Sequence, residues 1–353
     1  MRTDIDYRKL EYRQLGFDKF YEFHCVTGDC SPDIKVEKWI QDDLNFDFEK
    51  RCVMALFHGA TYAGPCESMF ADRFPVLTSD MSGPIKFFQE NKKRLLFSPD
   101  CKYRKIVFEK FLESVGESIK PYGTLGRFIE SCIGVSGNPD VTYGNLKKKC
   151  YENWFHWGRM GHWCFSEALN RFAVPLDPPT MEFDEGKSHR AGWAFCIGRD
   201  DLTGEKVSKA DLQLLEETAY EYIQDKKYVN AGFFTLETAC CNYKRQHKGS
   251  RYGGCYIDEQ YWETMMMKKD WPEYDWLWDK YLEGRQHVIP HSLLFENNPH
   301  EVEEAYLKDW CGALRDYGRI PRIEAWHNGT PQRWCKIEHL DFINKNSLDA
   351  LMQ

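Results

Sequence analysis

Acidic, thiol and cationic side chains follow one another closely near residue 240 of the chain. If residues 235–247 form a helix, Glu237, Cys241 and Lys244 succeed one another at steps of three or four, so we expect them to share one face. A carboxylate, a thiol and a cation are poor material for a core stripe. The alternative, an exposed face of ion pairs, would leave the tyrosines and tryptophan that follow unexplained. The stretch therefore predicts a polyanion-binding or catalytic site.

The signatures of the best-known enzyme classes are missing from the sequence. It contains no GxxxxGK[ST] loop, no GxGxxG after a strand, no HExxH and no GxSxG. Its 14 cysteines include no CxxC pair, which argues against a zinc ribbon. His287 and His291 have the spacing of a helical metal pair, but Pro290 between them disfavours that helix. We therefore predict no metal site.

Composition limits the class of protein and its partners. With 353 residues, 42% of them hydrophobic, the chain can bury the core of one large domain or two modest ones. It has no apolar run of about 18 residues and no apolar centre near the N-terminus, so we expect a cytoplasmic protein with no membrane partner. The net charge of -8 opposes bulk attraction to nucleic acid, although a local patch such as Lys147, Lys148 and Lys149 can still dock phosphates.

Hydrophobic periodicity predicts a mainly α fold with little β structure. Apolar residues recur at helical spacing from Lys102 to Ile119. Ser208, with Asp211 three residues later, predicts the N-terminus of another helix. Trp193, Phe195 and Ile197 alternate, which predicts one short strand or a small hairpin arm.

The segment 175–192 is rich in proline and charge and reads as a loop. We expect it to separate two helical lobes of one catalytic unit that spans residues 1–353.

The run ETACCNYKRQHKGSRYGGCYID, from Glu237 to Asp258, resembles a family of phage enzymes. These are the alpha-glutamyl/putrescinyl thymine pyrophosphorylases, or amino acid:DNA transferases. The stretches 55–65 and 155–163 are also compatible with that family. Asn242 is a departure, because the family has an aspartate there and an amide cannot act as a base.

The resemblance implies an activity and a fold. Family members act on DNA in which 5-hydroxymethyluracil, at a thymine position, is activated by pyrophosphate. An amine, such as an amino acid or a polyamine, displaces the pyrophosphate and leaves a hypermodified thymine. The partners are then this DNA and an amine of the glycine, glutamate or putrescine class. The implied fold is a two-lobed helical domain akin to the helix-hairpin-helix DNA glycosylases.

The implied chemistry assigns roles to the residues of the run. Cations would oppose the charge on the departing pyrophosphate. The candidates for this role are Lys244, His247, Lys248 and Arg251. Glu237 or Asp258 could orient the amine and take its proton, or each could be a helix cap or an ion-pair partner. Cys241 could attack C6 of the pyrimidine or could serve packing alone.

The target base must be flipped out of the duplex or met in single-stranded DNA. The candidates for a base or amine pocket are His58, Tyr62, Asn242, Tyr252 and Tyr256. His58 and Tyr62 are expected in a glycine-flanked turn. The candidates for contact with the DNA backbone are Lys147, Lys148, Lys149 and Arg159.

Three other functions stay open at this point. The chain could be a DNA N-glycosylase of the helix-hairpin-helix type, a non-catalytic module that binds modified DNA, or an enzyme acting on a small phosphorylated metabolite. The sequence does not single out one amine. No motif requires a cofactor, although Mg²⁺ bridging pyrophosphate to Glu237 or Asp258 is compatible with the chemistry.

Overall fold

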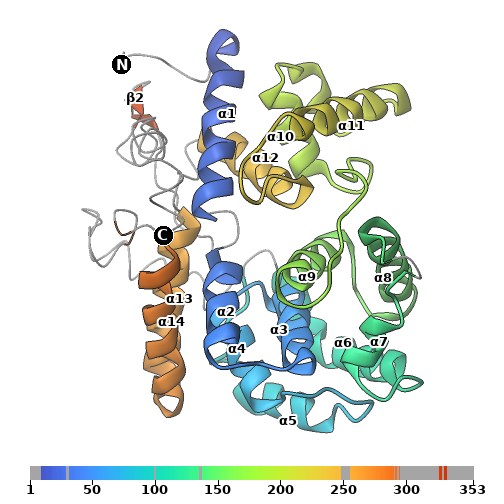
Figure 1. Cartoon of the computed structure of the whole chain (residues 1–353), viewed down its shortest axis with the longest axis vertical. Helices are drawn as coiled ribbons and strands as arrows, with labels where there is room; N and C mark the ends of the chain where they lie inside the picture. The colour runs from blue at the N-terminus through green and yellow to red at the C-terminus, as the bar shows by residue number, and fades with distance from the viewer. Residues whose placement is uncertain are drawn as a thin grey trace. The chain divides into compact units, whose positions relative to one another are not determined.

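The computed structural model describes residues 9–28, 32–98, 101–134, 137–247, 255–289, 291, 294, 326–327 and 330–331. Within these ranges the protein is mainly α-helical, as the sequence predicts (Figure 1). None of the described helices combines the length and the apolar character that crossing a bilayer requires.

The chain divides into two compact units. Unit 1 comprises Met1–Pro32, Pro179–Ile257 and Arg322–Gln353, and unit 2 comprises Asp33–Pro178 and Asp258–Pro321. One of the divisions between them falls inside the proline-rich segment 175–192. That the whole chain works as a single catalytic unit stays a prediction.

Unit 1 contains four of the described α-helices and a short 3-10 helix. They are α1 (Leu10–Thr27), α10 (Lys187–Cys196), η2 (Asp200–Leu202), α11 (Lys209–Gln224) and α12 (Phe233–His247). A two-residue strand pair, β1 (Trp326–His327) and β2 (Thr330–Pro331), is antiparallel.

Aromatic side chains make the core of unit 1. The ring of Phe17 on α1 packs 5.8 Å from that of Trp193 on α10 and 5.3 Å from that of Tyr243 on α12. The hydroxyl of Tyr243 donates to the backbone oxygen of Arg13 at 2.9 Å. Because buried aromatic residues of this size dominate core energetics, they fix α10 and α12 against α1.

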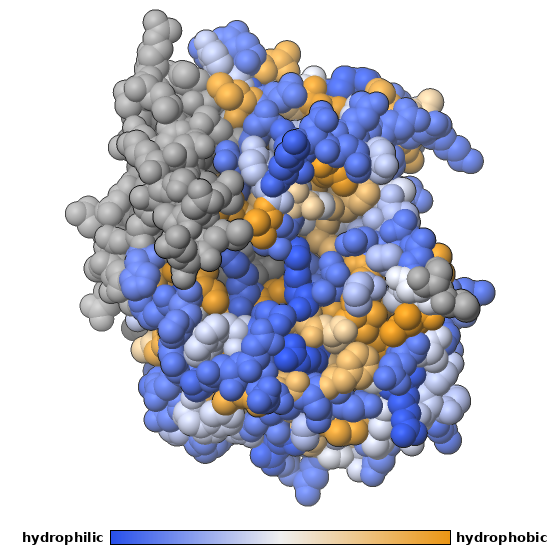
Figure 2. Space-filling view, viewed as in Figure 1, coloured by the Kyte–Doolittle hydropathy of each residue, from blue (hydrophilic) through white to orange (hydrophobic). Residues whose placement is uncertain are grey.

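The N-terminus of α11 follows its predicted cap. The side chain of Ser208 accepts a hydrogen bond from the backbone N–H of Asp211 at 3.1 Å. Trp193 donates from Nε1 to the backbone oxygen of Leu215 at 3.1 Å, which ties α11 to α10. The opposite face of α11 is hydrophilic, as Figure 2 shows.

The predicted strand at residues 193–197 is wrong. Trp193 and Phe195 belong to helix α10, and Ile197 caps its C-terminus. The pattern misleads because Trp193 and Ile197 are also four residues apart, which is a helical spacing. Three alternating residues are too few to distinguish the two periods.

Unit 2 contains nine of the described α-helices. The first residue of one of them, Pro32, is assigned to unit 1. The nine helices are α2 (Pro32–Asp43), α3 (Phe48–Thr61), α4 (Gly64–Arg73), α5 (Ser82–Asn91), α6 (Lys102–Ile119), α7 (Leu125–Glu130), α8 (Pro139–Asn153), α9 (Arg159–Phe172) and α14 (Asp275–Val288), with α13 (Cys255–Asp270) shared and η3 (Pro272–Tyr274) after it. Helix α6 has the predicted bounds.

Helix α3 lies at the centre of unit 2, and its residues 52–61 are all buried. It crosses α9 through two glycines. A Cβ atom on Gly59 would lie 2.5 Å from the backbone oxygen of Gly161, closer than any side chain allows. Phe57 stacks on Phe70 of α4 with ring centroids 4.3 Å apart. The core therefore forms around α3, between α4 and α9.

Candidate active site

Helix α12 carries the three chemical residues with which the sequence analysis began. It runs from Phe233 to His247, so the predicted helix over 235–247 is confirmed. Glu237, Cys241 and Lys244 are four and three residues apart and therefore share one face. Cys241 and Lys244 are half-buried, and the side chain of Glu237 is 15% exposed.

The N-terminal half of α10 lies against this face. A Cβ atom on Gly192 would lie 2.4 Å from the backbone oxygen of Cys240. The backbone of α12 at Cys240 therefore lies directly against the backbone of α10 at Gly192. Only glycine fits at this crossing, because it has no Cβ atom. Burial raises the pKa of the Cys240 thiol well above its ordinary value. Cys240 is thus a packing residue at the crossing.

His189 on α10 faces Glu237. The Nε2 atom of His189 lies 2.9 Å from the backbone oxygen of Met181, and because a carbonyl only accepts, Nε2 carries the proton. The other nitrogen, Nδ1, lies 3.5 Å from Oε1 of Glu237. The ring is buried and stacks on Phe183. Its position is fixed from both sides.

A second contact joins the two helices beside that pair. The thiol of Cys241 donates to Oγ of Ser188 at 3.4 Å. Ser188, His189, Glu237 and Cys241 together are called the α10–α12 site below. A carboxylate backed by an imidazole whose other nitrogen is anchored can take up a proton and hold it. This arrangement is suited to deprotonating an amine.

Sequence reasoning missed Ser188 and His189. Both lie in the segment 175–192, which we interpreted only as a boundary loop. A signal was present, because Gly186 precedes a run of polar residues that includes the histidine. A Cβ atom on Gly186 would lie 1.8 Å from the ring of His189, so a side chain at position 186 would displace that ring.

Asn242 lies on the other side of α12 from Glu237. It is 1% exposed, and neither its amide nitrogen nor its amide oxygen has a hydrogen-bond partner among the described residues. Its predicted place in a base or amine pocket stays a prediction.

Most of the predicted pyrophosphate ligands are not described. Lys248, Arg251 and Tyr252 lie outside the described residues. His247 ends α12 and Asp258 lies in the first turn of α13, but their side chains are outside the description too. The half-buried Tyr256 precedes Asp258 on α13.

His58 and Tyr62 belong to unit 2. His58 is not in a turn, as we expected, but in the last turn of α3 and 1% exposed. A helix satisfies the backbone hydrogen bonds of this fully buried segment, whereas a turn would not. Tyr62 is half-buried and caps the helix in a left-handed conformation with φ 50°.

The predicted contacts to the DNA backbone are placed around α8 and α9. Lys149 donates to the hydroxyl of Tyr122 at 3.1 Å and to Oγ of Ser131 at 2.8 Å, so it holds unit 2 together. Lys148 is exposed. The half-buried Lys147 and Arg159 lie over the rings of Tyr151 and Trp163, respectively.

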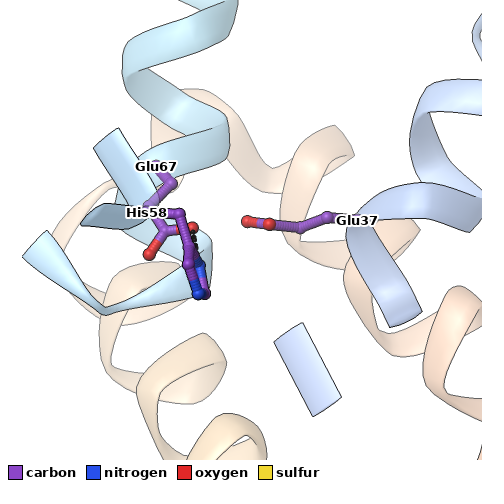
Figure 3. Close-up of side chains that lie close together, drawn as sticks. All are labelled: Glu37, His58 and Glu67. Carbon is purple, nitrogen blue, oxygen red and sulfur yellow. Dashed lines mark hydrogen bonds and ion pairs between the residues drawn. The ribbon is translucent and has the colours of Figure 1, made fainter. Parts of the chain in front are cut away.

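A group of side chains in unit 2 has the composition of a metal site. One ligand atom from each of Glu37, His58 and Glu67 lies within 4.8 Å of the others, and all three side chains are buried (Figure 3). Burial raises the pKa of both glutamates well above the ordinary value. No other such group of three occurs among the described residues.

Comparison with known proteins places the α10–α12 site in a family context. A family model described as amino acid:DNA transferase matches residues 62–252, which is more than half of the chain and includes α10 and α12. A serinyltransferase of Salmonella phage ViI is 24% identical over 366 residues, covering 94% of this chain and 86% of the phage protein. No solved structure matches the chain.

Proposed function

The chain belongs to the amino acid:DNA transferase family, and from this premise we propose that it replaces pyrophosphate with an amine on 5-(pyrophosphoryloxymethyl)uracil in DNA. The product is a hypermodified thymine. The observation that carries the proposal is the pairing of Glu237 with His189 inside the region that the family model matches.

The reaction is a displacement at the methylene carbon of the base. The bond between this carbon and the bridging oxygen breaks, and pyrophosphate departs with the electron pair. A bond forms between the amine nitrogen and the same carbon. Because the amine arrives as an ammonium ion, it must lose one proton before it attacks and a second afterwards.

Glu237 takes the proton of the amine in this proposal. Nδ1 of His189 can accept the hydrogen of the Glu237 carboxyl once Glu237 has taken up the proton. The ring of His189 is held between Phe183 and the oxygen of Met181. A positioned general base typically contributes a factor of about 10² to 10⁴ to the rate. Asp258 is the second candidate base, on sequence grounds.

Cations neutralise the leaving group. Lys244 lies on the same face of α12 as Glu237, and on sequence grounds we add His247, Lys248 and Arg251. A fixed cation acts most strongly on charge that develops in the transition state. We assign Cys241 a positioning role, because its thiol hydrogen-bonds Ser188 and thereby joins the two helices of the site.

The target base is flipped out of the stack to reach the site. Asn242, Tyr252 and Tyr256 of unit 1 remain the proposed pocket residues, and Tyr62 of unit 2 stays a separate prediction. His58 is 1% exposed, so we no longer propose that it touches the substrate. Helix α9 begins after Gly158, and a Cβ atom added there would meet nothing within 4 Å. This exposed helix N-terminus and Lys148 are suited to contact a phosphate of the DNA. We propose that the protein acts on this DNA in the cytoplasm, which is that of the host cell if a phage encodes the chain.

Serine is the first amine to test, because the phage relative is a serinyltransferase. The experiment mixes the protein with DNA that carries the pyrophosphorylated base and, separately, with serine, glycine, glutamate and putrescine. The nucleosides are then weighed by mass spectrometry. The proposal expects one amine to add its mass, minus water, to hydroxymethyluridine. Glu237→Gln should abolish this product.

A control variant separates chemistry from folding. His287 is exposed on α14 of unit 2, so His287→Gln should leave the product yield unchanged. Abasic sites in place of the adduct would indicate a glycosylase. Binding of the DNA with no change in mass would indicate a non-catalytic module. Either result would refute the proposed transfer.

A further inference from the structure

Glu37, His58 and Glu67 form a cluster of three buried ionisable side chains, which packing alone does not explain. Its three side chains come from α2, α3 and α4 of unit 2, and each is 0% or 1% exposed. Figure 3 shows the carboxylate of Glu37 pointing toward the paired His58 and Glu67. Two carboxylates buried side by side repel one another unless a proton or a cation lies between them.

Neighbouring side chains hold the ligand atoms in place. Oε1 of Glu37 accepts a hydrogen bond from the hydroxyl of Tyr281 at 2.7 Å. Oε1 of Glu67 accepts one from the backbone N–H of Ala63 at 2.8 Å. Nδ1 of His58 lies 2.8 Å from Oε2 of Glu67. Outer hydrogen bonds of this kind orient the ligands of known metal sites.

Two buried atoms in the cluster are left without a partner. They are Oε2 of Glu37 and Nε2 of His58, neither of which has a hydrogen bond to a described residue. Nδ1 is the nitrogen of His58 that lies beside Glu67, so it is the nitrogen that would bind an ion there, and Nε2 would then carry the proton. Leaving a buried polar group unsatisfied costs about 1–3 kcal/mol. Oε2 of Glu37 is an electron-pair donor, so a cation between the three side chains would satisfy it.

A third carboxylate makes the local charge more negative. Asp33 is half-buried, and it accepts a hydrogen bond at 2.8 Å from Nε2 of Gln260, whose own oxygen accepts from Arg285 at 2.9 Å. Arg285 acts on this carboxylate, whereas His58 is the basic group beside Glu37 and Glu67. A divalent ion would offset the excess of negative charge.

We propose that Glu37, His58 and Glu67 form a buried binding site for one divalent transition-metal ion in unit 2. Imidazole together with carboxylates is a donor set that suits zinc, manganese and iron. Two ligands, each about 2.1 Å from a metal, lie about 3.0–3.4 Å apart in tetrahedral or octahedral geometry. The His58–Glu67 pair therefore needs to open by a few tenths of an ångström only.

The ion joins three consecutive helices. Residues 37, 58 and 67 lie on α2, α3 and α4, and Tyr281 adds α14. The site is sealed from solvent, so the ion stabilises unit 2 and takes no part in the transfer reaction. The inference does not depend on the proposed function, because its test involves no DNA.

The test measures zinc in the purified, tag-free protein. After loading with Zn²⁺ and removal of the excess, mass spectrometry of the metal should find one equivalent per chain. Glu37→Gln keeps the shape of the side chain but removes its charge, and should lower the affinity at least about tenfold. The matched control is His162→Gln, since His162 is equally buried and its ring forms a hydrogen bond with Ser166.

A second measurement covers the case in which the variant does not fold. Wild-type protein stripped by a chelator and then given excess Zn²⁺ should unfold at a temperature higher by about 5 °C. Substoichiometric zinc in the wild type, or no rise in its unfolding temperature, would overturn the proposal. Equal zinc in wild type and a folded Glu37→Gln variant would overturn it as well. In these cases a shared proton fills the cluster.

Discussion

Replacing Gly192 by alanine should damage both the stability of unit 1 and the transfer reaction. The added Cβ would lie 2.4 Å from the backbone oxygen of Cys240 and 2.7 Å from its carbonyl carbon, whereas ordinary contact begins at 3.4 Å. Helices α10 and α12 must therefore separate by about 1 Å, the difference between these distances. Overpacking of this kind costs about 1–3 kcal/mol. The better helix propensity of alanine returns about 1 kcal/mol.

The net loss in the free energy of unfolding should be about 0–2 kcal/mol, measured by urea unfolding followed by circular dichroism. Because His189 and Glu237 lie on the two separated helices, transfer should fall about a hundredfold, as misplacements of this size do.

The matched control is Gly144→Ala. Gly144 is an exposed position within α8, and an added Cβ would meet nothing within 4 Å. This substitution should stabilise by about 0.5–1 kcal/mol and leave transfer unchanged. The reasoning fails if Gly192→Ala is stabilised as Gly144→Ala is, or if it is fully active.

Three further predictions concern single side chains. Burial lowers the pKa of His162 to about 3 from 6.5, so the unfolded chain binds a proton between these values while the folded protein does not. Stability is therefore lost as the pH falls through this window, and at about pH 5 the loss due to His162 should be about 2 kcal/mol. Urea unfolding should show a correspondingly smaller loss for His162→Gln, and an equal loss in both proteins would contradict the assignment. His189→Gln should reduce transfer at saturating substrate, and adding Glu237→Gln should cost little more, because residues that act as a unit are not additive; additive losses would show that they act separately. Cys241→Ser should retain transfer to within about threefold, since a hydroxyl can replace the hydrogen bond to Ser188; a loss of about a hundredfold or more would instead identify Cys241 as a nucleophile.

Local signals were sufficient to predict much of the helical structure. The apolar spacing from Lys102 to Ile119 and the cap at Ser208 are properties of one helix each, and both are found in the structure. The face of α12 could likewise be predicted, because Glu237, Cys241 and Lys244 share it through helical geometry alone. The strand predicted at residues 193–197 was wrong because three alternating residues are too few to distinguish a strand from a helix.

Contacts between distant segments could not be predicted. His189 is separated from Glu237 by 48 positions, and no pattern in either segment predicts that the two residues are in contact. Their meeting depends on the backbone approach at Gly192, which only packing reveals. The contact of Glu37 with His58 and Glu67 could not be predicted either, because it depends on how α2 packs against α3 and α4. The tertiary fold, and not the spacing of residues, assembles both sites.

The most direct test of the account follows the bridging oxygen between the methylene carbon and the pyrophosphate. DNA with ¹⁸O at this position is incubated with the protein and serine until the base is converted, and both products are weighed. The account predicts that all of the label leaves with the pyrophosphate and that the nucleoside gains the amine. Label retained in hydroxymethyluridine, with no amine attached, would mean that water attacks phosphorus, and would contradict the proposed displacement.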